Sequence, residues 1–149
     1  MKLLSNLTKQ NHRKRIVELI SKSDHIVLCS GWMKRAGLKK ILPALENAKQ
    51  KNNAVITIYS NKKHTDEECI IALNDFRHIV VDDIYSKYLH TKIYYFQAEN
   101  NFNAIIGSAN ITHGGLVSND ELSVEISGLI GSKEHQDISS YLEQLEKYA

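Results

Sequence analysis

His90-Thr91-Lys92-Ile93-Tyr94-Tyr95-Phe96 begins with polar side chains and continues as an apolar, aromatic run. Such a run is typical of a buried strand, in which side chains alternate between two faces. His90 and Lys92 then project from one face, roughly 6–7 Å apart along the strand. A second apolar run, 104–110, ends in Gly107-Ser108-Ala109-Asn110. If the two strands pair, an imidazole, an ammonium, a hydroxyl and a carboxamide converge, and this set suits a bound phosphate.

The first half of the chain predicts helices and strands in alternation. Periodic apolar residues predict a helix over about 8–22 and a second one around 38–45, which Pro43 either kinks or forces to begin just before it. Thr65 with Glu68 has the spacing of a capping box. The expected elements of this half are a strand over 25–32, a strand over 54–59, a helix from 65 to about 75 and a strand over 77–82.

The second half predicts mainly strands. A polar connection over 83–88 leads to a strand over 89–97, and a turn over 97–103 joins it to an antiparallel strand over 103–108. A glycine-containing loop over 112–119, a strand over 121–127 and a final helix capped by Ser132 follow. The order α-β-α-β-α-β-β-β-β-α predicts an α/β fold with a mixed, mostly parallel sheet and helices on both faces, in one domain over 1–149.

Composition places the chain among ordinary globular proteins. It has 149 residues, a formal net charge of +2 and no apolar run of transmembrane length. The start of the chain is too short and too polar for a signal peptide. Cys29 and Cys69 lack metal-type spacing, so we expect them in the core of a cytoplasmic protein, with no membrane partner.

Charge is distributed unevenly along the chain. Residues 1–63 contain fourteen Lys/Arg and three Asp/Glu, a net +11, whereas 64–149 carry a net −9. This asymmetry favours a surface for a polyanion, although a solvated basic helix face gives the same pattern. The candidates for substrate contact are Arg13, Lys14, Arg15, Lys34, Lys39, Lys40, Lys62, Lys63 and His113.

Three further side chains lie at the ends of predicted strands, where ligands bind in sheets of this class. Trp32 either stacks on a base or packs in a core or an interface. Ser30 and Asn61 are weaker candidates for the same pocket. His64, beside Lys62 and Lys63, either contacts a phosphate or lies in a solvated turn.

A His-x-Lys pair alone has little meaning in a chain with seven histidines, so its context matters. His90-x-Lys92, then Gly107-Ser108-x-Asn110, then Asn119-x-Glu121 together resemble the phospholipase D superfamily, also called the HKD family. The closest likeness is to small bacterial nucleases and metal-independent restriction endonucleases. The family pattern has an aspartate five residues after the lysine, where this chain has Gln97.

The resemblance agrees with the chemistry of these groups. A neutral imidazole can attack phosphorus and hold it as a covalent phosphohistidine, which assigns His90 as the nucleophile. Lys92 and Asn110 can stabilise the nonbridging oxygens, and Ser108 can add a hydroxyl donor. Glu121 is the candidate carboxylate for the far nitrogen of the His90 ring. No metal and no cofactor is needed.

The departing alkoxide needs a proton from a second acid, and we interpret the chain as having a single His-x-Lys motif. The resemblance implies a homodimer, in which the second subunit's His90 is the general acid. The predicted function is therefore a metal-independent nuclease, acting on nucleic acid and most plausibly on DNA. Two alternatives remain open: a phospholipid phosphodiesterase or phosphatidyl transferase, and a non-catalytic nucleic-acid-binding module. Both DNA and RNA remain open as substrates, and the short chain favours low sequence specificity or a partner that supplies specificity.

Overall fold

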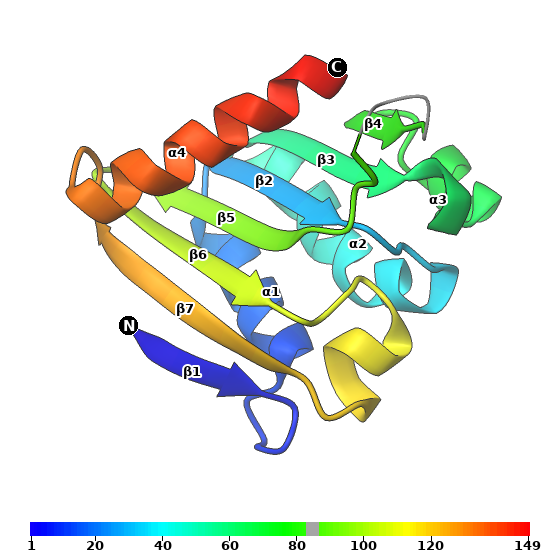
Figure 1. Ribbon diagram of the computed structural model, residues 1–149, viewed down its shortest axis with the longest axis horizontal. Coiled ribbons are helices and arrows are strands. Elements are labelled where there is room, and N and C mark those ends of the chain that lie inside the picture. The colour runs from blue at the N-terminus through cyan, green and yellow to red at the C-terminus, as the bar shows by residue number, and fades with distance from the viewer. Residues whose placement is uncertain (83–86) are drawn as a thin grey trace.

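A seven-stranded sheet with the order β1-β7-β6-β5-β2-β3-β4 forms the centre of the molecule (Figure 1). The computed structural model describes residues 1–82 and 87–149. The pairings of β2 with β3 and of β3 with β4 are parallel, and the other pairings between the described strands are antiparallel. The strands are β1 Lys2–Ser5, β2 His25–Ser30, β3 Val55–Asn61, β4 Arg77–Val81, β5 Lys92–Ala98, β6 Asn101–Gly107 and β7 Leu122–Leu129.

Helices cover both faces of this sheet, as predicted. In Figure 1, α4 crosses the front of the sheet, and α1 and α2 lie behind it. The apolar stripe of α1, with Ile16, Leu19 and Ile20, is buried in the core on the rear face, whereas Ile138 and Leu145 of α4 belong to the second core. The helices are α1 His12–Lys22, α2 Arg35–Lys51, α3 Glu67–Ala72 and α4 Lys133–Leu145, with short turns η1 Lys62–His64, η2 Gly114–Ser118 and η3 Glu146–Tyr148.

The α/β class with a mixed sheet is confirmed, but the sheet is less parallel than predicted. Two strand-to-strand connections, β5 to β6 and β6 to β7, join antiparallel neighbours. The sequence also gave no sign of β1, because its four residues form a short edge strand that pairs only with β7 among the described residues. Glu99, with φ of 54°, and Asn100 make the tight turn between β5 and β6, so the predicted turn over 97–103 was too long.

The structure bears on two expectations about helix ends. α2 begins at Arg35 and continues through Pro43, so it does not begin just before the proline, whose exposed position lets solvent satisfy the freed carbonyl. The capping-box prediction was wrong, because the Thr65 hydroxyl donates to Asn61 O at 2.7 Å and lies 2.8 Å from Ser60 Oγ. Asp66 occupies the N-cap position instead. Ser132 caps α4 as predicted, by accepting from the His135 amide.

Two further expectations concern the cysteines and the predicted polar connection over 83–88. Cys29 and Cys69 are free and buried, in agreement with the sequence. Residues 83–86 of the predicted polar connection lie outside the described residues.

The strand register brings several predicted residues to one edge of the sheet. Ser30 at the end of β2 is paired with Lys92 at the start of β5. Gly107 at the end of β6 is paired with Ser123 of β7. Because antiparallel neighbours place the end of one strand beside the start of the next, the segments that follow β2 and β6 meet the segment that precedes β5.

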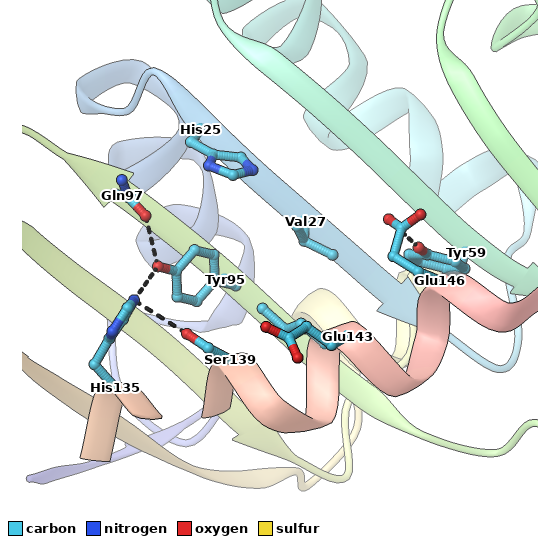
Figure 2. A pocket seen from close by; sticks show the side chains of 10 residues that line it. His25, Val27, Tyr59, Tyr95, Gln97, His135, Ser139, Glu143 and Glu146 are labelled. Atoms are coloured by element: carbon cyan, nitrogen blue, oxygen red, sulfur yellow. Dashed lines mark hydrogen bonds between the residues drawn. The ribbon is translucent and has the colours of Figure 1, made fainter. Parts of the chain in front are cut away.

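Gln97 lies near the opposite end of β5, where it is paired with His25 at the start of β2. Its Oε1 accepts a hydrogen bond of 2.7 Å from the Tyr95 hydroxyl. Both side chains line a cavity of about 380 Å³ between α4 and the sheet (Figure 2). Gln97 lies five positions along the strand from Lys92, which is a distance of roughly 17 Å. The departure from the family aspartate therefore lies away from the predicted chemistry, in a structural contact.

Candidate active site

His90 and Lys92 are brought together at the edge of the sheet. β5 begins at Lys92, so His90 precedes the strand that was predicted to contain it. Lys92 Nζ nevertheless lies 3.1 Å from Nε2 of the exposed His90 ring. Burial lowers the pKa of Lys92, and the negative charge of Glu121 partly opposes that shift. An ammonium beside an accessible imidazole is suited to an incoming phosphate, and the charge of Glu121 favours that charged form of Lys92.

Ser108 and Glu121 form a second pair next to this one. Ser108 Oγ donates to Glu121 Oε1 at 2.5 Å and accepts from the Leu122 amide at 3.1 Å. Glu121 Oε2 accepts from Asn119 Nδ2 at 3.3 Å. The predicted contact between Glu121 and the His90 ring is not formed among the residues that the structure describes. The Glu121 carboxylate accepts a hydrogen bond from the Ser108 hydroxyl instead of one from the His90 ring.

Asn110 is held with its amide group oriented. Its Oδ1 accepts from the Trp32 amide at 3.0 Å and lies 3.3 Å from Ser30 Oγ. The buried Tyr94 hydroxyl donates to Ala109 O at 2.6 Å, which fixes the preceding backbone. Because its oxygen is engaged by protein donors, Asn110 has its two N–H donors to offer to a nonbridging phosphate oxygen.

Two residues position the segment that carries His90. The buried Asn61 donates from Nδ2 to Leu89 O at 3.0 Å. Gly31 donates from its amide to Thr91 O at 3.1 Å, and a Cβ at Gly31 would lie 3.2 Å from the His90 Cα. Asn61 was predicted as a weak pocket residue, and Gly31 was missed. The signal for Gly31 was its place directly after a buried strand, which is meaningful only when the neighbouring backbone is known.

Replacing Gly31 with alanine is expected to reduce turnover about 10-fold, because moving a reacting group by a fraction of an ångström weakens alignment. The added Cβ forces His90 to shift by a few tenths of an ångström. Steady-state kinetics and thermal unfolding of Gly31→Ala should show a loss of kcat that exceeds any loss of stability. Unchanged kcat would mean that this close approach does not position His90.

The predicted basic residues are divided between several elements. Arg13 and Lys14 are exposed in the first turn of α1, Lys39 is exposed and Lys40 half-buried on α2, and His113 is exposed before η2. Lys62 and Lys63 lie in η1, directly after β3. Lys34 is half-buried and forms a 3.5 Å ion pair with Asp66.

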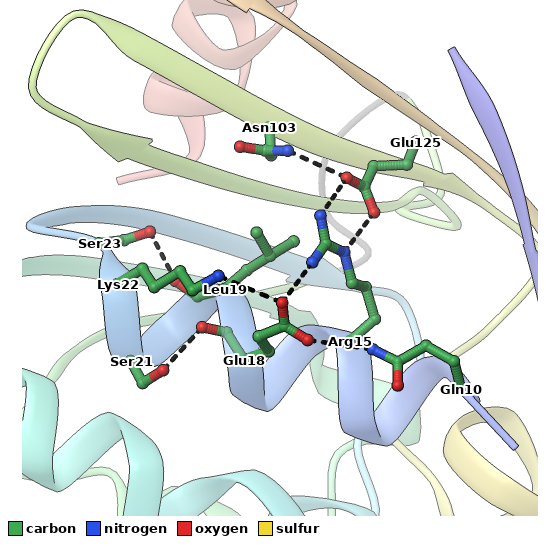
Figure 3. Close-up of polar contacts among 9 residues, drawn as sticks. All are labelled: Gln10, Arg15, Glu18, Leu19, Ser21, Lys22, Ser23, Asn103 and Glu125. Atoms are coloured by element: carbon green, nitrogen blue, oxygen red, sulfur yellow. Dashed lines mark hydrogen bonds and ion pairs between the residues drawn. The ribbon is translucent and has the colours of Figure 1, made fainter.

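Arg15 does not belong to this group (Figure 3). Its guanidinium binds both oxygens of Glu125 at 2.7 Å, with side chains 13% and 3% exposed respectively. It also contacts Glu18 at 2.8 Å, and Asn103 Nδ2 donates to Glu125 at 3.0 Å. Arg15 therefore ties α1 to the sheet, and the prediction that it contacts substrate was wrong. Helical spacing alone cannot show that a carboxylate on a distant strand lies opposite it.

The sequence also contains a second His-x-Lys, His12-Arg13-Lys14, so the interpretation of a single motif was wrong at the level of pattern. His12 is fully buried at the start of α1, and its ring nitrogens lie 2.8 Å from Asn6 Oδ1 and 2.8 Å from Ser123 Oγ. Burial lowers the pKa of His12, against the influence of Glu121. This histidine is a structural member of the fold, and His90 remains the accessible one of the two.

Within residues 1–82 and 87–149, no three His, Cys, Asp or Glu side chains are grouped so that they could hold a metal ion. In the same part of the chain, none of the helices has the length and apolar content to cross a membrane.

The site geometry can now be set beside known proteins. The family described as the NgoFVII restriction endonuclease N-terminal PLD domain, where PLD is phospholipase D, matches residues 7–148. The chain belongs to this family. The resemblance drawn from the His90, Asn110 and Glu121 motifs is thereby confirmed. No curated protein matches the sequence.

Solved structures share the fold of this PLD-domain family member at low sequence identity. NucT from Helicobacter pylori has a TM-score of 0.74 and 13% identity, and the match covers 99% of this chain and 95% of that one. Nuc from Salmonella typhimurium, a phospholipase D family member, has a TM-score of 0.72 and 17% identity over 99% and 91%. Phosphatidylserine synthase from Haemophilus influenzae has a TM-score of 0.65 and 14% identity over 95% and 35%. The chain therefore has the phospholipase D fold, in agreement with its family.

Proposed function

We propose that the chain is a metal-independent phosphodiesterase that cleaves nucleic acid, with DNA as the expected substrate. The observation that carries this proposal is the convergence of His90, Lys92, Ser108 and Asn110 at one edge of the sheet, in a member of a restriction endonuclease family. The basic residues on η1 and in the first turn of α1 give this edge the charge that a polyanion requires.

The first step transfers the phosphoryl group to the enzyme. A neutral imidazole nitrogen of His90 attacks phosphorus, an N–P bond forms and the bond to the leaving oxygen breaks. The Lys92 ammonium and the Asn110 amide stabilise the nonbridging oxygens as negative charge develops. Ser108, held by Glu121, orders the neighbouring backbone at Leu122, and the Glu121 charge favours the protonated form of Lys92.

The leaving oxygen needs a proton, and the second step needs a base. His90 of a second copy supplies the proton as an imidazolium and is left neutral. It then takes a proton from water, which attacks phosphorus, breaks the N–P bond and releases the second product with His90 restored. This scheme requires a homodimer, because of the two His-x-Lys motifs in one chain only that of His90 has an exposed histidine.

The test is incubation of the purified chain in EDTA with plasmid, single-stranded DNA, RNA and phospholipid vesicles, together with nucleic-acid binding at several salt concentrations and sedimentation to measure its mass. We expect cleavage of at least one nucleic acid and a dimer at assay concentrations. Turnover of phospholipid vesicles without nucleic-acid cleavage would instead favour the lipid phosphodiesterase. Salt-dependent binding without any turnover would favour the non-catalytic module, and a fully active monomer would exclude the shared site.

A further inference from the structure

An exposed row of aromatic rings leads to His90. The Trp32 indole stacks on the His64 ring, with centroids 4.2 Å apart and planes 8° from parallel. Tyr88 meets His64 edge-on at 5.8 Å and lies 6.3 Å from the His90 ring. Trp32 is 39% exposed and Tyr88 47% exposed, although Trp32 lies only two residues after the end of the buried strand β2. A large ring that stays exposed beside a reactive group offers a free surface to a ligand.

The row is tied firmly to the candidate active site. The Trp32 amide donates to Asn110 Oδ1, the same side chain that we assign to a phosphate oxygen. Ser30 Oγ donates to Trp32 O, and the Met33 amide donates to His64 O at 3.0 Å. The backbone of this segment is therefore fixed relative to Asn110, and a ligand on the indole has a defined position relative to the phosphate.

Lysines lie beside the same rings, and two of them are also ion-paired, Lys34 with Asp66 at 3.5 Å and Lys62 with Asp82 at 3.0 Å. Lys34 Nζ lies 5.3 Å from the Trp32 ring centroid, and Lys62 and Lys63 immediately precede His64. Burial lowers the pKa of His64, and the charges of Lys34, Lys63 and His90 lower it further. A neutral His64 continues the stack as a flat ring without adding a cation to it. Flat rings bordered by lysines are the combination found where proteins bind single-stranded nucleic acid.

We propose that Trp32, backed by His64, is a stacking platform for an unpaired base next to the scissile phosphate. The base lies on the exposed part of the indole while its phosphate reaches Asn110, Lys92 and His90. Stacking tolerates any base, but it requires a base whose face is not already covered by its neighbours in a duplex. The inference rests on the proposed nuclease function and narrows its substrate to single-stranded or locally unpaired nucleic acid.

The sequence contains one tryptophan, so its intrinsic fluorescence reports on the platform directly. The inactive His90→Ala protein should be titrated with a single-stranded oligonucleotide, a blunt duplex and an oligomer of abasic units with equal phosphate number. We expect quenching by the single strand and little by the other two, with binding of all three followed independently by anisotropy. Equal quenching by the duplex or the abasic oligomer, or binding of the single strand without quenching, would overturn the platform.

A kinetic cycle locates the base on otherwise active protein. A single abasic unit is moved along a single-stranded substrate on both sides of the mapped cleavage position. We expect one position to lower kcat/KM about 10- to 100-fold in the natural protein and to have no effect in Trp32→Ala, with Trp32→Phe retaining most of the sensitivity. The same abasic penalty in Trp32→Ala as in the natural protein would overturn the assignment.

These outcomes distinguish failure of the stacking platform from failure of the proposed nuclease function. If the natural protein cleaves single strands but no abasic position matters, the platform fails and the nuclease stands. If the natural protein cleaves no nucleic acid, the proposed function fails by itself. A Trp32→Ala protein that has lost its dimer in sedimentation would place the indole in the contact between copies and would overturn the platform.

Discussion

Replacing His90 with alanine is expected to lower DNA cleavage by about 10⁴-fold or more, as removal of the nucleophile does in enzymes with covalent intermediates. The variant lacks the atom that forms the N–P bond, and water has no positioned base to replace it. The measurement is single-turnover cleavage of labelled DNA in EDTA. Because the His90 side chain is exposed, stability in urea should change by only about 0.5 kcal/mol.

His25→Ala is the matched control for this substitution. His25 is also an exposed histidine, but it lies at the start of β2, opposite the end that pairs with Lys92. We expect the control to cleave at the natural rate. If His90→Ala retained activity within a factor of about ten of the control, the nucleophile would have to be assigned elsewhere.

Mixing subunits extends the same prediction to the dimer. Natural and His90→Ala chains are refolded together in varied proportions, so that they assort at random. One composite site per dimer makes activity follow the square of the natural fraction, about a quarter at equal proportions, whereas independent sites retain about half. A linear dependence would show that each chain works alone.

Replacing Arg15 with alanine is expected to destabilise the fold by about 3–5 kcal/mol, the usual result of removing one partner of a buried ion pair. Glu125 is 3% exposed and would keep the Asn103 hydrogen bond but lose both bonds from the guanidinium. A buried carboxylate that loses both bonds from its cation is poorly solvated. Urea denaturation followed by circular dichroism gives the change in the free energy of unfolding.

Two further variants separate charge from packing. Arg13→Ala removes an exposed arginine from the same turn of α1, and we expect a change within about 0.5 kcal/mol. The double variant Arg15→Met with Glu125→Leu removes both charges and should recover most of the lost stability. A double variant as unstable as Arg15→Ala would mean that the shape of the pair matters more than its charge.

The pH dependence of the Arg15→Ala effect has a definite sign. Burial by itself would raise the pKa of Glu125, but the bonds from Arg15 and Asn103 outweigh it and lower the pKa below the ordinary 4.5. In the natural protein this contribution to stability is present above pH 4.5 and is lost as the pH falls below it. In Arg15→Ala, burial dominates and the carboxyl binds a proton more readily. The destabilisation should therefore be largest near pH 7 and shrink toward pH 4.5.

The candidate site was predictable where its residues are close in sequence or share a strand pattern. His90 with Lys92, and Ser108 with Asn110, were predicted from spacing and from the strands beside them, and their family is confirmed. Their roles in catalysis remain predictions. The contact of Glu121 with Ser108 was not predictable, because Ser108 follows β6, Glu121 precedes β7, and only the register of these two strands brings them together. The same holds for Gly31, whose importance comes from backbone that is close only in the folded chain.

By itself, the sequence determined the helices, six of the seven described strands, the placement of helices on both faces of the sheet and the family, because hydrophobic periodicity and motif spacing are local properties of the chain. Tertiary structure alone decided which charged residues face substrate and which hold the fold together. Arg13 and Arg15 are the same residue type, two positions apart in the sequence. Arg15 packs against the Glu125 carboxylate of β7, whereas Arg13 is exposed to solvent. Tertiary structure likewise decided that Trp32 stays exposed and stacks on His64, since the two rings come from separate segments that meet only at the edge of the sheet. Long-range contacts of this kind depend on register and packing, which no local pattern encodes.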